Sequence, residues 1–356
     1  MAVDYKKELE ILIDTVVHEH GSDLHLSVGS HPSIRVSGSL IPLVRKPILT
    51  DIDVTSFAKV LLRPDFLETL QNTRREVDFS YENANKVRFR GNAFYQKGHI
   101  SVVLRLIPNV ILNLEELNLP PILESFTERN QGFFLCVGPV GQGKSTTLAA
   151  MVNRINQKRA DHIVTIEDPI EYVYTPEKAM IDQREVGIDT DSFETALHSA
   201  FRQDVDVILI GEMRSPETIS TAVTAAETGH LVYATLHTND AAQTINRIID
   251  SFPGSQQDQI RTQLASSLIA IFSQRLIPRI NGGLVPAYEL LINNTAVSNL
   301  IRERRTHEVY SVIETGLEQG MIDMNRTLAQ LVQRGEITVE NAFLYSSNPK
   351  GLERLI

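Results

Sequence analysis

The residues from Gly138 to Ser145 read GPVGQGKS, and this segment restricts the possible folds of the chain more than any other. It matches the pattern G-x-x-x-x-G-K-[ST], whose glycines let the backbone turn so that successive N–H groups point at phosphate oxygens. An apolar run precedes it at 131–138, and apolar residues recur at helical spacing over 148–155. The sequence therefore predicts a strand, a phosphate-binding loop and a helix whose positive N-terminal end faces the loop.

From Gln131 onward, apolar strands alternate with amphipathic helices. Such alternation is typical of βαβ units, in which helices cover a mainly parallel sheet. The expected strands are residues 131–138, 161–168, 206–212 and 231–238. After about Asn239 the remainder is predicted to be almost wholly helical, with C-terminal helices over about 295–356. The predicted fold class is therefore α/β.

The first hundred residues show a different pattern. A helical pattern from Tyr5 to about Glu19 is followed by short alternating segments between turn residues, which predicts an antiparallel α+β domain. Pro108 and the pair Pro120-Pro121 bracket a stretch that is unsuited to a continuous helix. We therefore expect a domain at 1–107, a linker at 108–121 and a second domain at 122–356.

Charge and composition argue against some classes of function. Lys and Arg total 34 against 44 Asp and Glu, so the net charge of −10 disfavours a general binder of nucleic acid or anionic membranes, although a local basic stripe is left open. The one cysteine, Cys136, can form neither an internal disulfide nor a Cys-based zinc site. The uncharged stretch Thr262–Gln274 is 13 residues long, short of the ~20 apolar residues of a membrane span. Acids near the N-terminus also disfavour a signal peptide, so we expect a cytosolic protein.

The phosphate-binding loop implies particular ligands. Lys144 is expected to reach the β- and γ-phosphates of a nucleotide, and the Ser145 hydroxyl is expected to hold Mg²⁺. The expected ligands are therefore ATP and Mg²⁺. The residues predicted to bind the phosphates are Gly138, Pro139, Val140, Gly141, Gln142, Gly143, Lys144, Ser145 and Thr146.

Polar residues also follow the other predicted strands. Open parallel sheets bind ligands at the carboxyl ends of their strands, and these ends meet at one edge. The residues found there are Glu167, Asp168 and Glu171, then Glu212, then His237. One such carboxylate alone would more often be a solvated loop residue or a helix cap, but together they suit phosphate, Mg²⁺ and water. The residues alone therefore predict a magnesium-dependent ATP hydrolase.

Two histidines flank one of these strands, His230 before it and His237 at its carboxyl end. Seven residues of strand span ~23 Å, and an odd spacing points the two side chains to opposite faces. One nucleotide therefore cannot be touched by both from a straight strand. We assign His237 to the γ-phosphate and His230 to a structural or inter-subunit role.

Three further segments resemble motifs of the type IV pilus and type II secretion ATPases. TIEDPIEYV, from Thr165 to Val173, resembles the family's acidic "Asp box". RQDVDVILIGEMR, from Arg202 to Arg214, resembles its Walker B segment, and TAAETGHLVYATLHTND, from Thr224 to Asp240, resembles its His box. The resemblance extends over nearly the whole chain, from Gly21 to Thr338.

The resemblance implies a homohexameric ring in which a PAS-like N-terminal domain packs on a RecA-like ATPase core, with nucleotide between the two domains. It places the catalytic glutamate at Glu171, which would orient or deprotonate the attacking water. It places the Walker B glutamate at Glu212, which would act on Mg²⁺ directly or through water. The family's arginine-bearing segment matches RFRGNAFYQKGHISVVLRLIP, which offers Arg90 and Arg105, with Arg88 behind them, to neutralise charge on the leaving group.

Within the family, the chain is most similar to the motors that retract pili. Assembly motors and their type II secretion relatives carry a four-cysteine zinc insertion after the His box, whereas residues 273–291 contain no cysteine. The retraction-linked motif AIRNLIRE stands as AVSNLIRE at 296–303, with Val297 and Ser298 in place of Ile and Arg. The resemblance therefore implies a retraction motor at the cytoplasmic face of the inner membrane. It would act on a pilus platform protein, reach the membrane only through that partner and bind no nucleic acid stably.

Other functions are left open by the sequence. An accessory retraction ATPase or a secretion ATPase without zinc would carry the same motifs. Hexameric RecA-like rings also move nucleic acid, and a basic pore lining can be hidden in an acidic total. A scaffold that binds ATP and barely hydrolyses it is disfavoured by the pair Glu171 and Glu212.

Overall fold

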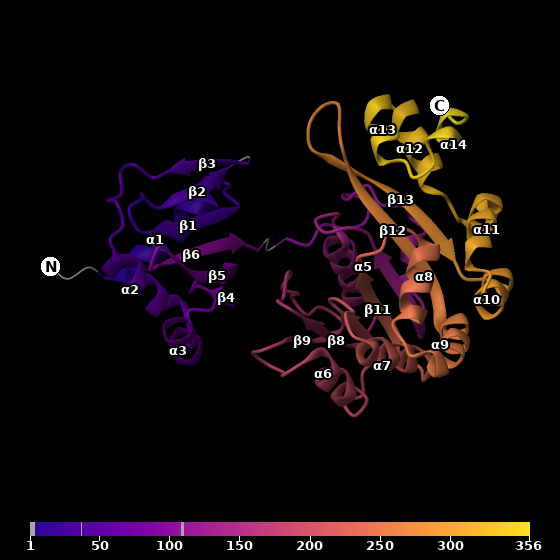
Figure 1. Cartoon of the computed structure of the whole chain (residues 1–356), viewed down its shortest axis with the longest axis horizontal. Coiled ribbons are helices and arrows are strands. Elements are labelled where there is room, and N and C mark those ends of the chain that lie inside the picture. Colours follow the sequence, from indigo (N-terminus) through magenta and orange to yellow (C-terminus); the bar gives the residue numbers. More distant parts are fainter. Residues whose placement is uncertain (1–3, 37, 108–109) are drawn as a thin grey trace. The chain divides into compact units, whose positions relative to one another are not determined.

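The chain divides into two compact units, Met1–Val110 and Ile111–Ile356 (Figure 1). The computed structural model describes residues 4–36, 38–107 and 110–356. Among these residues, none of the helices combines the length and the apolar character needed to cross a membrane.

The N-terminal unit is an antiparallel α+β unit. Its six strands lie in the order β3-β2-β1-β6-β5-β4, and every neighbouring pair is antiparallel. Its elements are α1 (Tyr5–His18), β1 (Asp23–Ser27), β2 (Ser33–Val36), β3 (Ser39–Pro42), α2 (Asp51–Leu61), α3 (Pro64–Thr73), β4 (Val77–Glu82), β5 (Arg88–Gln96) and β6 (His99–Leu106). The expected helix at 5–19 and the antiparallel strands are present, whereas α2, α3 and β3 were not predicted.

The amphipathic helix α1 contributes one face to the hydrophobic core of this unit. Its N-cap Asp4 accepts a hydrogen bond from Lys7 N, and its buried residues recur every three or four positions, as a half-buried helix requires. The core also takes in α2, whose N-terminal capping box pairs Thr50 with Asp53. That Thr50 signal, together with Pro64 at the start of α3, could have revealed both missed helices.

The C-terminal unit contains a seven-stranded sheet in the order β13-β12-β7-β11-β10-β8-β9. All neighbouring pairs are parallel except β12 and β13, which are antiparallel. The strands are β7 (Gly132–Val137), β8 (His162–Glu167), β9 (Met180–Glu185), β10 (Val207–Ile210), β11 (Leu231–Leu236), β12 (Leu268–Pro278) and β13 (Leu284–Ile292). The α-helices are α4 (Leu123–Thr127), α5 (Lys144–Lys158), α6 (Phe193–Ala200), α7 (Pro216–Glu227), α8 (Ala241–Asp250), α9 (Gly254–Ser267), α10 (Thr295–Arg302), α11 (Val309–Thr315), α12 (Met324–Gln333), α13 (Val339–Tyr345) and α14 (Pro349–Glu353), with short 3₁₀ helices η1 (Thr306–Glu308) and η2 (Leu317–Gln319). The predicted α/β class with a mainly parallel sheet is confirmed.

Strand β7 lies inside this sheet, between β12 and β11, and is buried on both faces. Phe133, Leu135 and Val137 belong to a core that includes residues of α6, α7, α8 and α9. Phe134 and Cys136 belong to the opposite core, with residues of α4 and α5. Because successive side chains of a strand point to opposite faces, one apolar run supplies both cores.

The prediction that the chain is almost wholly helical after about Asn239 is wrong, because β12 and β13 form a long hairpin. Seven of the eleven residues of β12 are buried without alternation, so hydrophobic periodicity could not distinguish this strand from a buried helix. The turn carried a clearer signal. Gly282 and Gly283 have φ angles of +84° and +79°, and a Gly-Gly pair between apolar runs is typical of a hairpin.

The far end of this hairpin carries a separate apolar cluster. Ile277 of β12 and Val285 of β13 pack with residues of the C-terminal helices, among them Leu328 of α12 and Ala342 of α13. Figure 1 shows α12, α13 and α14 grouped beyond this end of β12 and β13. The predicted C-terminal helices are therefore present from α10 onward, and the last three are joined to the sheet through the hairpin.

The expected linker at 108–121 is placed differently by the structure. Leu114 and Leu119 are buried in the core that contains α4 and α5, so residues 111–121 belong to the second unit. Apolar side chains at these positions anchor an irregular stretch that prolines keep from being helical. Pro108 and Asn109 lie outside the described residues.

Glu289 of β13 is a buried carboxyl group whose effect on the stability of this unit can be tested. Its side chain is 4% exposed, its Oε1 accepts a hydrogen bond from Ala241 N at 2.9 Å, and burial raises its pKa to about 7. A carboxyl group whose pKa is raised by folding stabilises the protein below its unfolded pKa, and this contribution is lost as pH rises through the folded pKa. We therefore expect thermal stability to fall as pH rises from about 5 to about 7, between the unfolded and the folded pKa, and to level off above that.

Glu289→Gln is the variant that isolates this effect. It keeps an acceptor for Ala241 N–H and cannot ionise, so its melting temperature should fall less steeply than that of the unmodified chain between about pH 5 and pH 7. Glu167, whose pKa is also raised to about 7, contributes equally to both proteins and cancels in the comparison. Parallel slopes in thermal melts would contradict the expectation.

Candidate functional site

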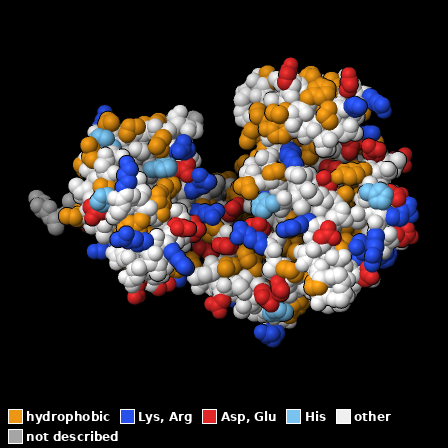
Figure 2. All heavy atoms as spheres, in the orientation of Figure 1, with side chains coloured by type: hydrophobic (Ala, Val, Ile, Leu, Met, Phe, Trp, Pro, Cys, Tyr) orange, Lys and Arg blue, Asp and Glu red, His pale blue; other side chains and the backbone are white. Residues whose placement is uncertain are grey.

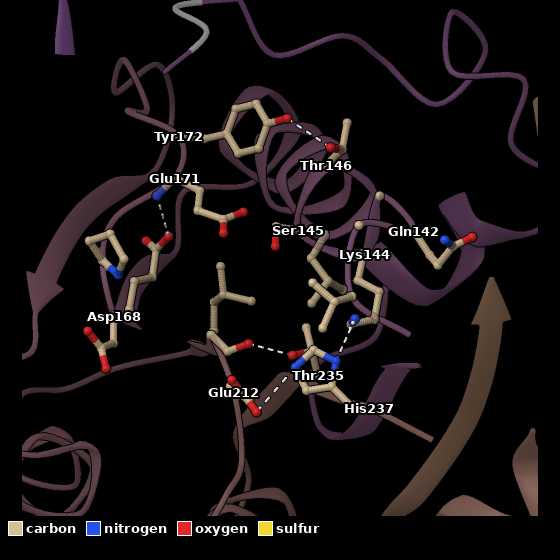
Figure 3. Close-up of a pocket in the computed structure, with 18 of the residues that line it drawn as sticks. Gln142, Lys144, Ser145, Thr146, Asp168, Glu171, Tyr172, Glu212, Thr235 and His237 are labelled. Atoms are coloured by element: carbon tan, nitrogen blue, oxygen red, sulfur yellow. Dashed lines mark hydrogen bonds and ion pairs between the residues drawn. The ribbon is translucent and has the colours of Figure 1, made fainter. Parts of the chain in front are cut away.

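A pocket of about 450 Å³ lies at the carboxyl ends of the parallel strands of the C-terminal unit (Figure 3). Its walls come from the loop after β7, the segment after β8, the end of β10 and the end of β11. This is the edge at which the sequence predicted that polar groups would meet.

The loop after β7 takes a shape that requires glycine. A Cβ atom on Gly138, whose φ is +148°, would lie 2.5 Å from the carbonyl oxygen of Gln274. Gly143 has a φ of +76° and forms the N-cap of α5, which begins at Lys144. The loop thus ends in the free N–H groups of a helix N-terminus, a ready site for an anion such as phosphate.

Lys144 is largely buried, with 7% of its surface exposed, and its ammonium group has three acceptors. Nζ donates to the carbonyl oxygens of Gly138 and Pro139, each at 2.8 Å, and to Nδ1 of His237 at 3.1 Å. Burial lowers the pKa of Lys144, and the nearby charges of Glu212 and Glu171 act in the opposite direction.

His237 connects Lys144 to Glu212. An ammonium group can only donate, so Nδ1 of His237 must accept, and the neutral ring then carries its proton on Nε2. Nε2 lies 3.2 Å from Oε1 of Glu212, whose other oxygen accepts from Arg214 at 2.8 Å. Burial would raise the pKa of Glu212, but the Arg214 and His237 interactions hold it below its ordinary value. The result is an unbroken chain of donors and acceptors along one wall of the pocket (Figure 3).

The segment 168–174 carries Glu171, and side chains of β8 and β9 hold its backbone. Glu171 N donates to Oε2 of Glu167 at 3.3 Å, and Ile170 N donates to Oε2 of Glu185 at 3.3 Å. Gln183 makes two bonds to the same segment, accepting from Tyr174 N at 2.9 Å and donating to the carbonyl oxygen of residue 172 at 2.7 Å. Figure 3 shows the Glu171 carboxylate directed into the pocket on the side of Ser145.

Two more contacts complete this wall. The Tyr172 hydroxyl and Oγ1 of Thr146 are 2.8 Å apart, which joins the Glu171 segment to the first turn of α5. Glu167 is 7% exposed, and burial raises its pKa to about 7, although its Oε1 accepts from Thr165 Oγ1 at 2.6 Å. The segment that carries Glu171 is therefore bonded both to side chains of the sheet strands β8 and β9 and to the first turn of α5, the helix that follows the phosphate-binding loop.

The structure brings most of the predicted site residues together. Lys144, Ser145, Glu171, Glu212 and His237 all line the pocket, as do the loop residues Val140, Gly141, Gln142, Gly143 and Thr146. Gly138 and Pro139 lie behind them and accept from Lys144. Asp168 also lines the pocket, but its carboxylate is turned away from Lys144 (Figure 3).

The other three predicted residues lie elsewhere in the chain. His230 precedes β11 at the end opposite to His237, and its Nδ1 is 3.0 Å from the carbonyl oxygen of Ala225. Arg90 and Arg105 belong to the N-terminal unit, where they are directly paired on β5 and β6. Nε of Arg105 donates to Oδ1 of the buried Asp23 at 2.8 Å.

Sequence reasoning missed several residues of this site. Tyr172 and Arg214 lie within quoted motifs but were given no role, and Gln183 and Gln274 lie on strands that were not predicted. A buried polar side chain among apolar neighbours, as Gln274 is in the run 268–278, is the one sequence signal that could have drawn attention to it.

The donor set fits a hydrated Mg²⁺ ion. The Ser145 hydroxyl and the Glu212 carboxylate are hard oxygen donors, and Mg²⁺ commonly takes one or two protein oxygens together with substrate phosphates and waters. These two residues would hold the ion, and their role as its ligands stays a prediction.

Gln183 provides a test of how firmly the Glu171 segment must be held. In Gln183→Ala the backbone at residues 172 and 174 loses both bonds, so Glu171 should be less well placed, and ATP hydrolysis should fall ~10- to 100-fold. Binding of ADP should change little, because the phosphate-binding loop is untouched. Phosphate release and binding of a fluorescent ADP would be measured. Met180→Ala, at the exposed start of the same strand, is the control; equal loss in both variants would count against the prediction.

Comparisons with known proteins agree with this geometry. The profile of the Type II/IV secretion system protein family matches residues 5–341. The chain is 46% identical over 327 residues to the type IV pilus retractation ATPase PilT of Pseudomonas aeruginosa, covering 90% of this chain and 93% of the relative. It is 40% identical over 353 residues to the type IV pilus ATPase PilU of the same species, covering 98% and 91%.

The structure is also similar to a solved one. It matches the crystal structure of the pilus retraction motor PilT with bound ADP with a TM-score of 0.91 and 46% identity, over 97% of this chain and 98% of that chain. The matching profile and the relatives each extend over nearly all of the sequence. This chain therefore belongs to the Type II/IV secretion system protein family.

Proposed function

We propose that this chain is an ATP hydrolase that drives retraction of a type IV pilus. The observation that carries the proposal is the pocket itself, in which a glycine-shaped anion site and a firmly held glutamate face one another. The similarity to PilT along nearly the whole chain supports the assignment to retraction.

Substrate binding is assigned to the phosphate-binding loop. The N–H groups at the start of α5 and the Lys144 ammonium would contact the phosphates. Lys144 at present donates to two carbonyl oxygens and a neutral histidine, and a phosphate oxygen is a stronger acceptor than either. Ser145 and Glu212 would hold Mg²⁺, which neutralises phosphate charge when bound.

Water activation is assigned to Glu171. Its carboxylate would orient the attacking water and accept its proton as oxygen bonds to the γ-phosphorus and the bond to the β-γ bridging oxygen breaks. The products are ADP and inorganic phosphate. We place His237 where it can turn its ring toward the γ-phosphate, because it already contacts Lys144, which serves the same group.

The resemblance to the family assigns a further role to the N-terminal unit. Arg90 and Arg105 lie side by side on neighbouring strands with exposed side chains, and Asp23 holds Arg105 by a charge-assisted bond. We propose that these arginines neutralise charge on the leaving phosphates in a homohexamer, with nucleotide between domains. The platform protein of the pilus machinery, at the cytoplasmic face of the inner membrane, is the proposed partner.

Charge argues against the alternative of nucleic-acid translocation. The net charge is −10, and on the face shown in Figure 2 the Lys and Arg side chains of the larger unit are interspersed with Asp and Glu side chains. DNA-stimulated ATP hydrolysis that weakens with salt would favour that alternative.

An accessory role in retraction is the second candidate, because the chain is also 40% identical to PilU over 98% of its length. Complementation separates the two roles. A strain lacking its retraction motor should regain twitching if this chain is the motor itself. Recovery only in a strain that keeps another retraction motor would favour the accessory role.

Two substitutions test the proposed chemistry. Lys144→Ala should lose both ATP hydrolysis and tight nucleotide binding, because the loop loses the ammonium group that would contact the phosphates. Glu171→Gln should keep binding of ADP within a few-fold but lower hydrolysis by about 100-fold or more, since an amide cannot accept the proton. Phosphate release and nucleotide titration would be measured on each.

Glu177→Gln is the matched control, because Glu177 is an exposed carboxylate a few residues beyond Glu171. It should behave as the unmodified chain does. Equal hydrolysis rates in all four proteins would exclude the proposed roles of Lys144 and Glu171.

A further inference from the structure

We infer that Gln274 of β12 is a positioning residue for the phosphate-binding loop, which it holds in the shape that accepts the phosphates of a nucleotide. This inference rests on the proposed function, because it assumes that the loop binds a nucleoside di- or triphosphate. Gln274 lies 132 positions beyond the loop residue Gln142 in sequence, and its side chain is 3% exposed.

Both ends of the Gln274 amide are bonded to the loop region. Oε1 accepts from Oγ1 of Thr147 in the first turn of α5 at 2.7 Å. Nε2 donates to the carbonyl oxygen of Gln142 at 2.7 Å. One rigid amide group thus fixes the distance between the loop and the helix that follows it.

The bond to Gln142 sets the direction of the next peptide N–H. In a trans peptide, the C=O of one residue and the N–H of the next point in opposite directions. Because the Gln142 carbonyl is directed at β12, the N–H of Gly143 is directed away from β12. Gly143 lines the pocket, so its N–H is available to a phosphate oxygen there.

A second contact ties the same loop residue to β12. The side chain of Gln142 accepts from Leu276 N at 2.7 Å, so its backbone and its side chain are bonded to alternate residues of one strand. The glycines allow this close approach. A Cβ atom on Gly143 would lie 2.9 Å from Nε2 of Gln274, and one on Gly138 would lie 2.5 Å from Gln274 O.

The contacts of Gln274 and Gln142 begin where the regular pairing of β7 with β12 stops. The parallel pairing of β7 with β12 ends with Val137 opposite Ser273. Beyond that pair, β7 turns into the loop, and the bonds of Gln274 and Gln142 replace the backbone ladder. The loop is therefore held against a buried strand before any phosphate arrives, which reduces the ordering cost of binding.

Gln274→Leu tests the inference, because leucine fills similar space and makes neither bond. The dissociation constant for a fluorescent ADP and the KM for ATP should each rise about 10-fold, because the loop contacts phosphate equally before and during the reaction. kcat at saturating ATP should stay within about threefold. A residue important only for folding would lower the amount of active protein without this split between KM and kcat.

Ser273→Ala is the matched control. Ser273 is the neighbouring residue of β12, is fully buried, and its hydroxyl has no hydrogen-bond partner among the described residues. Its ADP affinity should equal that of the unmodified chain. Melting curves without nucleotide would show which variants are folded.

Thr147→Val is a second variant in case Gln274→Leu does not fold. It keeps the side-chain shape and removes only the hydrogen bond to Oε1, so a smaller rise in the ADP dissociation constant is expected, about threefold. Unmodified ADP affinity in either folded variant would overturn the inference. Failure of the unmodified chain to bind ADP would instead overturn the proposed function.

Discussion

The burial of β7 and β11 along their whole length constrains where this chain can place polar groups. Strands that are apolar on both faces leave no room for charged side chains until the strand ends, because an unpaired buried charge is costly. The carboxyl ends of β7, β8, β10 and β11 lie at the same edge of the sheet. The polar residues that follow these strands therefore converge, although they are far apart in sequence, and the pocket forms at that edge.

Four polar side chains along one wall of the pocket, those of Lys144, His237, Glu212 and Arg214, are bonded to one another in a chain. Lys144 donates to two loop carbonyls and to His237, which in turn donates to Glu212, and Arg214 closes the chain on the solvent side. Each of these four side chains has a partner, so none of the four is left as an isolated charge. A ligand that carries negative oxygens can replace weak acceptors of Lys144 without leaving a charge unpaired, which is the property required of a phosphate site.

Local sequence patterns were sufficient to predict the phosphate-binding loop and the polar residues that follow the parallel strands. Both depend on short segments, where spacing and residue type largely determine the geometry. The residues that hold these groups in place were not predictable in this way. Gln274 contacts Gln142 across 132 positions, and β12 is an apolar run whose periodicity does not reveal a strand. Gln183 lies on the edge strand β9, whose polar residues resemble a loop.

The resemblance to the family supplied what the residues alone could not. Arg90 and Arg105 were identified only through it, because exposed arginines on strands usually have no function beyond solvation. Their pairing on β5 and β6, beside the buried Asp23, is a feature of the N-terminal unit itself. The likeness over nearly the whole chain to PilT gives this pairing its proposed meaning, since neither strand contains a distinctive motif.

The hairpin of β12 and β13 has a mechanical consequence. Gln274 contacts the nucleotide-binding loop, and Ile277, three residues further along the same strand, is buried against the C-terminal helices. An extended strand transmits tension along its length because its backbone has little slack, with a rise of about 3.3 Å per residue. Force applied to those helices would therefore reach the phosphate-binding loop through one short stretch of backbone.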